Sequence, residues 1–149
     1  MSEHSSDPAH ILLVEDNPGD VRLTKEAFKD GNIANQLHVV TDGRAALDFL
    51  YQRDDHVDAP RPDVVLLDLN LPHLNGDEVL AKLREDKEFS SLPVIVLTSS
   101  TAEEDVIKSY GLSANAYLTK PVSPVEFIET IRTFQEFWLS VVRLPHGDT

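Results

Sequence analysis

The sequence predicts an α/β fold in which five parallel strands form a sheet that is doubly wound by helices, a (βα)5 arrangement. Two observations lead to this prediction: five short apolar runs, and the helical patterns that alternate with them along the chain. Strands that alternate with helices of this length form parallel sheets with right-handed crossovers and helices on both faces. The length of 149 residues fits one domain of this kind.

The predicted strands are short apolar runs, most of which stop at a polar residue. The third run, V-V-L-L, is continuously apolar, as expected of a strand that is covered on both faces, and it ends at Asp68. This strand is therefore expected to be the central and most buried one. The five predicted strands span residues 10–14, 37–40, 64–67, 93–97 and 114–118.

Helix-start signals follow the strands. Asn17 before Pro18 fits an N-cap, and Asn75 with Glu78 fits a capping box. A polar segment at residues 52–61, which ends in prolines, is expected to be a surface loop. The predicted helices cover about residues 18–30, 43–50, 75–83, 101–111 and 123–142.

Composition limits the class of protein. We expect a flexible segment at residues 1–9, one domain at 10–144 that includes an extended last helix, and a tail at 145–149. The 26 acidic and 13 basic residues give a net charge of −13, which disfavours nucleic acid and anionic membranes and suits divalent cations. The chain has no cysteine, so disulfides and thiolate metal sites are excluded. No apolar run resembles a signal peptide or a membrane span, and a cytoplasmic protein is expected.

Polar residues follow all five predicted strands, and those after four of them carry chemistry that could form a site. In a parallel sheet all carboxyl ends lie at one edge, where open α/β folds bind their ligands. By itself, Asp68 fits the tip of an ordinary turn as well as it fits a functional site. The whole set of polar strand-end residues leads us to expect that their side chains meet at this edge. The set is Glu15, Asp16, Asp68, Thr98 and Lys120.

This set suits phosphoryl transfer assisted by a metal ion. Three carboxylates at close range repel one another, and oxygen ligands of this kind favour Mg²⁺. Asp68 is the expected nucleophile, with Asp16 as a ligand of Mg²⁺ and Glu15 acting through a metal-bound water. The Lys120 ammonium and the Thr98 hydroxyl would hold phosphoryl oxygens.

The six histidines give no support for a zinc site. They fall singly along the sequence, and only His73 lies near one of the polar strand ends. We interpret all of them as surface or packing residues: His4, His10, His38, His56, His73 and His146.

Across residues 10–138 the sequence resembles the receiver domain of two-component response regulators, which have a flavodoxin-like fold. The D-x-N-x-P run that begins at Asp68 and the N-G pair at Asn75 also fit this family. The strand-end residues that carry the resemblance are Glu15, Asp16, Asp68, Thr98, Lys120 and Pro121.

The resemblance implies a signalling function rather than an enzymatic one. It implies transfer of a phosphoryl group from the phosphohistidine of a sensor histidine kinase to Asp68, with the Asn70 backbone carbonyl as a further ligand of Mg²⁺. It also implies that the Lys120–Pro121 bond is cis. Thr98 and Tyr117 would move inward together when Asp68 is phosphorylated.

Two departures from a minimal receiver bear on the subtype: the segment at 52–61 and the tail F-W-L-S-V-V-R-L-P. This tail resembles that of the cyanobacterial phytochrome-associated response regulators, so the kinase could be a phytochrome-type photoreceptor. The last helix carries more apolar residues than docking on one sheet requires, which predicts a homodimer, although scattered exposed apolar residues are an alternative explanation. The predicted dimer residues are Ile128, Phe137, Val141 and Val142.

Other function classes fit less well. A flavodoxin-like electron carrier would need a first loop that accepts a phosphate, and E-D-N-P-G-D would repel it. A Mg²⁺-dependent aspartyl phosphatase of the haloacid dehalogenase type needs D-x-D-x-T, where this chain has Asp68-Leu69-Asn70-Leu71-Pro72. A degenerate receiver that acts as a phosphorylation-independent interaction module is the remaining alternative, and the intact acidic, threonine and lysine positions argue against it.

Overall fold

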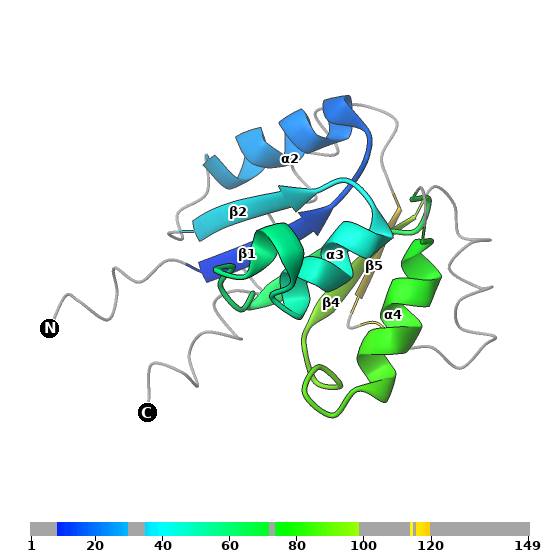
Figure 1. The fold of residues 1–149 in the computed structure, drawn as a ribbon. Coiled ribbons are helices and arrows are strands. Elements are labelled where there is room, and N and C mark those ends of the chain that lie inside the picture. Colours follow the sequence, from blue (N-terminus) through cyan, green and yellow to red (C-terminus); the bar gives the residue numbers. More distant parts are fainter. Residues whose placement is uncertain (1–8, 30–34, 72–73, 99–113, 115, 120–149) are drawn as a thin grey trace, which may run out of the picture.

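The computed structural model describes residues 9–29, 35–71, 74–98, 114 and 116–119 of the chain (Figure 1). These residues form a five-stranded sheet in the order β2-β1-β3-β4-β5, and every neighbouring pair of strands is parallel. The α/β prediction is therefore confirmed. The strands are β1 (Ala9–Val14), β2 (Asn35–Val40), β3 (Val64–Asp68), β4 (Val94–Thr98) and β5 (Ala116–Thr119).

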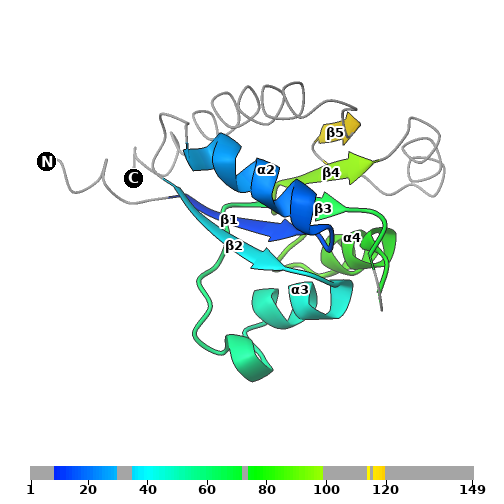
Figure 2. The same ribbon diagram turned by 90° about the horizontal axis from the view of Figure 1, so that it is seen from above.

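Helices cover both faces of the sheet (Figure 2). One face carries α2, and α3 and α4 lie side by side on the other face. Among the described residues, no helix is long and apolar enough to cross a membrane. The described helices are α2 (Pro18–Lys29), α3 (Gly43–Leu50) and α4 (Gly76–Glu85), with a short 3-10 helix η1 (Asp54–His56) after α3.

Alternation along the strands divides the core into two apolar layers. Leu12 and Val14 of β1 pack with residues of α3 and α4, whereas Ile11 and Leu13 pack with Phe28 of α2. This is the period of two that a strand imposes on its side chains. All five residues of β3 are buried, as its continuous apolar run predicted, because β3 lies between two strands and under helices on both faces.

The predicted helix starts at Asn17 and Asn75 are present, whereas the predicted helices at 101–111 and 123–142 lie outside the described residues. The Asp20 backbone N–H donates a hydrogen bond of 3.0 Å to Asn17 Oδ1, as expected of an N-cap. At the start of α4, the backbone N–H of Asn75 donates to Glu78 Oε1 over 3.1 Å, which is the return half of a capping box. These caps matter for function because each helix follows a strand end, after residues 15–17 for α2 and residues 69–75 for α4.

The segment at 52–61 is exposed for most of its length, as expected, but it is more regular than a simple surface loop. It contains η1, and its ends are fixed by side chains: Gln52 Nε2 donates to the Ala59 carbonyl, and Arg61 pairs with Glu88 at 2.6 Å. Among the described residues, the one exposed large hydrophobic side chain, Val57, lies in this segment.

The interpretation of the histidines as surface or packing residues holds for His10, His38 and His56, whose rings pack against other rings, but the contact between His10 and His38 was not predicted. His10 Nδ1 and His38 Nε2 lie 3.1 Å apart in a hydrogen bond, and the rings stack with centroids 5.3 Å apart. His38 in turn contacts the Phe49 ring. The two histidines are close because they stand on neighbouring strands and on the same face of the sheet.

Mild acid should weaken the fold through this pair. Burial, and then the neighbouring His10, lower the pKa of His38 from its ordinary value of 6.5, so the unfolded chain binds a proton more readily than the folded one. The stabilising contribution is present above about pH 6.5 and is lost as the pH falls from there toward the folded pKa. Urea unfolding at about pH 7.5 and 5.5 should show a lower midpoint in acid, with a smaller difference in His38→Gln. An equal difference in that variant would contradict the assignment.

Candidate functional site

Three carboxylates meet at the carboxyl edge of the sheet. One oxygen atom from each of Glu15, Asp16 and Asp68 lies within 4.8 Å of the others. Glu15 and Asp68 are only 1% and 2% exposed, whereas Asp16 is exposed to solvent. The structure therefore brings these three predicted residues together, with two buried groups and one that faces outward.

Backbone hydrogen bonds position the two buried carboxylates. The Glu15 N–H donates to the Val40 carbonyl at 3.0 Å, which extends the pairing of β1 with β2 by one residue. Glu15 Oε2 accepts the Asn17 N–H at 3.1 Å, and Asp68 Oδ1 accepts the Asn70 N–H at 3.1 Å. Each carboxylate thus turns back onto the loop that follows its own strand.

Close packing behind Asp68 also fixes the site. The Gly76 N–H, at the first position of α4, donates to the Leu69 carbonyl at 3.1 Å. A Cβ atom added at Gly76 would lie 2.3 Å from the Asp68 carbonyl oxygen and 2.7 Å from Leu69 Cα, both of them backbone atoms. Only glycine lets α4 approach the end of β3 this closely. The N-G pair is visible in the sequence, but this close approach of two backbones is not.

Thr98 supplies a buried hydroxyl at the end of the neighbouring strand. The residue is fully buried, and its Oγ1 has no hydrogen-bond partner among the residues that the structure describes. A buried hydroxyl without a partner is costly, and such groups in native proteins call for an explanation. Because β4 pairs with β3 in register Asp68↔Leu97, Thr98 stands at the same edge as Asp68. It suits an oxygen atom of a bound group.

The remaining predicted site residues are placed only in part. Asn70 is exposed in the loop after β3, and the Tyr117 backbone lies in β5 in register with Val96. Nothing is described of the Tyr117 side chain. Several predictions concern residues outside the described part of the chain and stay predictions: Lys120 and its cis bond, Ile128, Phe137, Val141, Val142, and the chain ends at 1–8 and 145–149.

The carboxylate cluster has the chemistry of a magnesium site. Mg²⁺ prefers oxygen ligands, uses one or two carboxylates, and retains several waters. Two buried carboxylates beside an exposed one provide charged oxygens on the protein side and an open side for water or a phosphoryl group. A bound cation would offset the repulsion between these carboxylates, which for two unit charges about 4.8 Å apart is roughly 3 kcal/mol at an effective dielectric constant near 20.

A hollow of about 370 Å³ adjoins the acidic cluster between α2 and the end of β2. Glu15 and Asp16 form one wall, and Val21 and Val39 contribute apolar surface. The two cations that line it, Arg22 and Lys25, were not identified from the sequence. Their spacing of three residues on a predicted helix was the available signal.

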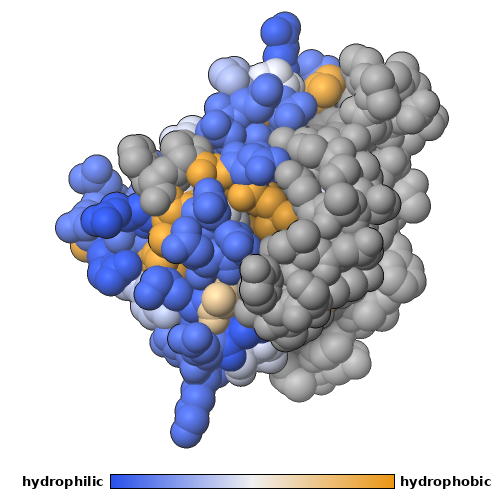
Figure 3. Space-filling model, turned by 90° about the vertical axis from the view of Figure 1, so that its right-hand side faces the viewer, coloured by the Kyte–Doolittle hydropathy of each residue, from blue (hydrophilic) through white to orange (hydrophobic). Residues whose placement is uncertain are grey.

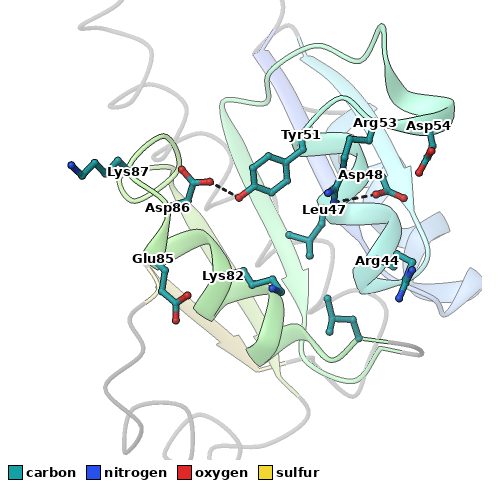
Figure 4. Close-up of a pocket in the computed structure, with 11 residues that line it drawn as sticks. Arg44, Leu47, Asp48, Tyr51, Arg53, Asp54, Lys82, Glu85, Asp86 and Lys87 are labelled. Carbon is teal, nitrogen blue, oxygen red and sulfur yellow. Dashed lines mark hydrogen bonds and ion pairs between the residues drawn. The ribbon is translucent and has the colours of Figure 1, made fainter.

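A larger groove of about 1040 Å³ lies away from the strand-end carboxylates, between α3 and α4 (Figure 4). Its cations and anions are mixed: Arg53 pairs with Asp48 at 3.2 Å and lies over the Tyr51 ring. The Tyr51 hydroxyl donates to Asp86, and burial, followed by this hydrogen bond, raises the pKa of Tyr51 to about 12. None of the three clustered carboxylates lines this groove, so it is not part of the candidate site.

The described surface beside α4 is mostly hydrophilic, with small apolar areas between the polar residues (Figure 3). This agrees with the polar lining of the groove between α3 and α4.

Comparison with known proteins places the site in context. The model of the response regulator receiver domain matches residues 11–132. The chain is 43% identical over 145 residues to the response regulator Rcp1 of Synechocystis sp., covering 97% of this chain and 99% of Rcp1. It is also 37% identical to a probable methanogenesis regulatory protein, FilR2, of Methanothrix harundinacea, covering 95% of this chain and 90% of FilR2.

Solved structures agree with the sequence comparison. The structure of Mn²⁺-bound Rcp1 matches with a TM-score of 0.82 and 43% identity, covering 89% of this chain and 95% of that one. The phosphorylated cyanobacterial phytochrome response regulator RcpA matches with a TM-score of 0.84 and 39% identity, covering 91% and 96% of the two chains.

Proposed function

Because this chain belongs to the family of response regulator receiver domains, we propose that Asp68 accepts a phosphoryl group from the phosphohistidine of a sensor histidine kinase. The observation that carries this proposal is the cluster of Glu15, Asp16 and Asp68, with Asp68 buried at the end of the central strand. Asp68 is only 2% exposed and its Oδ1 accepts the Asn70 N–H, so its carboxylate is held in position at the sheet edge, which favours attack on a correctly placed phosphoryl group.

In the proposed transfer an oxygen of the Asp68 carboxylate attacks phosphorus. The new O–P bond forms as the P–N bond to the kinase imidazole breaks, and the leaving imidazole takes up a proton. Little covalent work is required of the protein in such reactions, so positioning and charge neutralisation dominate. The product is an acyl phosphate on Asp68.

Mg²⁺ would be held by the carboxylates of Asp16 and Asp68, the backbone carbonyl of Asn70, and Glu15 acting through a water. When bound, it supplies positive charge that offsets the carboxylates and the phosphoryl oxygens. Support comes from the oxygen-only chemistry of the cluster and from the relative Rcp1, which has been crystallised in a Mn²⁺-bound form.

Thr98 and Lys120 would hold the phosphoryl group once it is on Asp68. The buried Thr98 hydroxyl, which lacks a partner among the described residues, would then gain one in a phosphoryl oxygen. The proposed signal is a joint inward movement of Thr98 and Tyr117. Thr98 belongs to β4 and Tyr117 to the neighbouring strand β5. A movement of Thr98 could therefore be passed to Tyr117 across this pair of strands.

Mg²⁺ should stabilise the folded chain. At about one hundred times its dissociation constant it would add roughly 2.7 kcal/mol, which raises the melting temperature of a domain of this size by about 5–10 °C. Thermal unfolding with and without Mg²⁺ measures this, and Asp16→Asn should lose most of the shift. Glu85→Gln, which removes a charge from α4 outside the cluster, is the matched control and should keep it. A melting temperature that Mg²⁺ leaves unchanged would argue against the site.

The kinase is proposed to be a phytochrome-type photoreceptor, and the transfer to take place in the cytoplasm. This proposal is supported by similarity to the cyanobacterial phytochrome response regulator RcpA over 91% of this chain. Radiolabelled, autophosphorylated phytochrome kinase should pass its label to this chain within seconds to minutes, faster than an unrelated histidine kinase does. Equal rates from both kinases would reject phytochrome specificity while leaving phosphorylation of Asp68 intact.

A small-molecule phosphodonor with Mg²⁺, followed by intact mass measurement, tests the acceptor function itself. Uptake of one phosphoryl group per chain supports the proposal. If no uptake occurs under conditions in which a known receiver is phosphorylated, the alternative of a phosphorylation-independent interaction module is favoured. Steady release of phosphate from added phosphomonoesters would instead favour an aspartyl phosphatase.

We further propose that two copies associate through the C-terminal segment, on the evidence of its excess apolar residues. Phe137→Glu should dissociate the dimer by placing a charge in an apolar interface, while leaving phosphoryl uptake unchanged. Sedimentation equilibrium at micromolar concentration measures the mass. A parent chain that is monomeric whether or not it is phosphorylated would reject the dimer.

A further inference from the structure

A second cluster of ligand-type side chains lies on β1 and β2, apart from the acidic cluster. His10 is near the start of β1, whereas Glu15 and Asp16 follow its end. In the register of the two strands Leu12 pairs with His38, so His10 and His38 are diagonal neighbours. Leu12 is two residues after His10, and Val40 is two residues after His38, so each shares a face of the sheet with its histidine. Both Leu12 and Val40 belong to the core layer on the α3 side, and both histidine rings therefore lie on that face.

The distance between the two ring nitrogens is that of two ligands on one metal ion. His10 Nδ1 and His38 Nε2 lie 3.1 Å apart. Two imidazole nitrogens, each about 2.0–2.1 Å from one zinc ion at a tetrahedral angle, lie about 3.3 Å apart. The protein therefore brings the two nitrogens almost to chelating distance without a metal, and a small separation of the rings is enough to admit one.

Neighbouring rings restrict the orientation of the pair. The Phe49 ring contacts the His38 ring with centroids 5.4 Å apart. The His56 ring packs against the same Phe49 ring, also with centroids 5.4 Å apart. On the β3 side, the backbone N–H of His10 donates to Asp63 Oδ2 at 2.8 Å, which ties the His10 backbone in place. Little conformational freedom is left to lose on metal binding, which favours affinity.

The protonation state of the pair also suits a metal. A neutral imidazole carries one proton, and this proton can occupy the nitrogen that faces away from the partner ring, so both facing nitrogens can present lone pairs without net release of a proton. Burial lowers the pKa of His38, which keeps this ring neutral, and so able to bind a metal, at neutral pH.

We propose that His10 Nδ1 and His38 Nε2 form a binding site for a transition-metal dication such as Zn²⁺, with water in the remaining coordination positions. This site is distinct from the carboxylate cluster in place and in chemistry, since imidazole suits Zn²⁺, Ni²⁺ and Cu²⁺ whereas the carboxylates suit Mg²⁺. The inference does not depend on the proposed phosphotransfer. A bound ion would join β1 to β2 and stabilise this edge of the sheet.

Titration calorimetry of the full chain with Zn²⁺ at neutral pH, in saturating Mg²⁺, tests the proposal. We expect one Zn²⁺ per chain, an affinity order in which Cu²⁺ exceeds Zn²⁺, and a loss of affinity of about tenfold or more in both His10→Gln and His38→Gln. His56→Gln is the matched control, because it removes a histidine of the same aromatic group whose ring does not contact the other two. It should bind Zn²⁺ like the parent, as should Asp68→Asn.

Two measurements keep the result clear if a variant folds poorly. Melting temperatures without metal report the folding of each variant, and ring-nitrogen NMR of the parent chain reports which histidines respond to Zn²⁺. Shifts at His10 and His38 support the site. Unchanged binding in both variants, loss of binding in Asp68→Asn alone, or unshifted His10 and His38 nitrogens would overturn the proposal and leave the pair as a hydrogen bond only.

Discussion

Replacing Asp68 with asparagine is expected to abolish phosphoryl uptake, both from a histidine kinase and from a small phosphodonor. An amide is a far poorer nucleophile than a carboxylate and cannot form the acyl phosphate. Intact mass measurement after incubation with Mg²⁺ and the donor reads the result directly. The matched control is Asp48→Asn, which alters a carboxylate that pairs with Arg53 in the groove between α3 and α4 and should leave uptake unchanged.

The same variant should unfold no more easily than the parent in the absence of metal. Asp68 is buried beside two other carboxylates, so its neutralisation removes like-charge repulsion at the sheet edge. Chemical denaturation in a chelator measures this, and the midpoint should be equal or higher. Phosphoryl uptake that persists in Asp68→Asn would show that another side chain is the acceptor. A lower midpoint would show that the favourable interactions of the Asp68 carboxylate outweigh its repulsion by Glu15 and Asp16.

The sheet and the meeting of its carboxylates were predictable because both follow from local patterns. A run such as residues 64–67 must be covered on both faces, and parallel strands put their carboxyl ends at one edge. The caps at Asn17 and Asn75 similarly depend on residues three positions apart. The meeting of Glu15, Asp16 and Asp68 could therefore be predicted without knowledge of any distant contact other than the order of the strands.

Features that depend on which strands are neighbours were missed. His10 and His38 are 28 residues apart, and their contact requires both the pairing of β1 with β2 and its register. The spacing of two residues from His10 to Leu12, and from His38 to Val40, was a usable signal that each histidine lies on the same face as a core residue. The 3-10 helix after α3 was missed for another reason: it is a single turn of three residues, Asp54–His56, which is too short for any periodicity to reveal.

The close approach of α4 to the end of β3 explains why the position after Asn75 is glycine. Alanine is normally favoured over glycine in helices by about 0.5–1 kcal/mol, so propensity alone would make Gly76→Ala stabilising. Its Cβ would lie 2.3 Å from the Asp68 carbonyl oxygen, a backbone atom that cannot move without moving the strand end. Overpacking of this kind costs about 1–3 kcal/mol or more and should outweigh the gain.

Gly76→Ala is therefore expected to lower the free energy of unfolding and to slow phosphoryl uptake, because displacement of a reacting group by about 1 Å can cost roughly a hundredfold in rate. Gly19→Ala is the matched control: it is also near the start of a helix, but its added Cβ would meet only the end of the Asn17 side chain, at 3.2 Å. Urea unfolding and the rate of uptake from a phosphodonor, both measured well below the melting temperature, separate the two variants. If Gly76→Ala matches Gly19→Ala in both measurements, the strand end is free to shift, and the contact between α4 and β3 does not position Asp68.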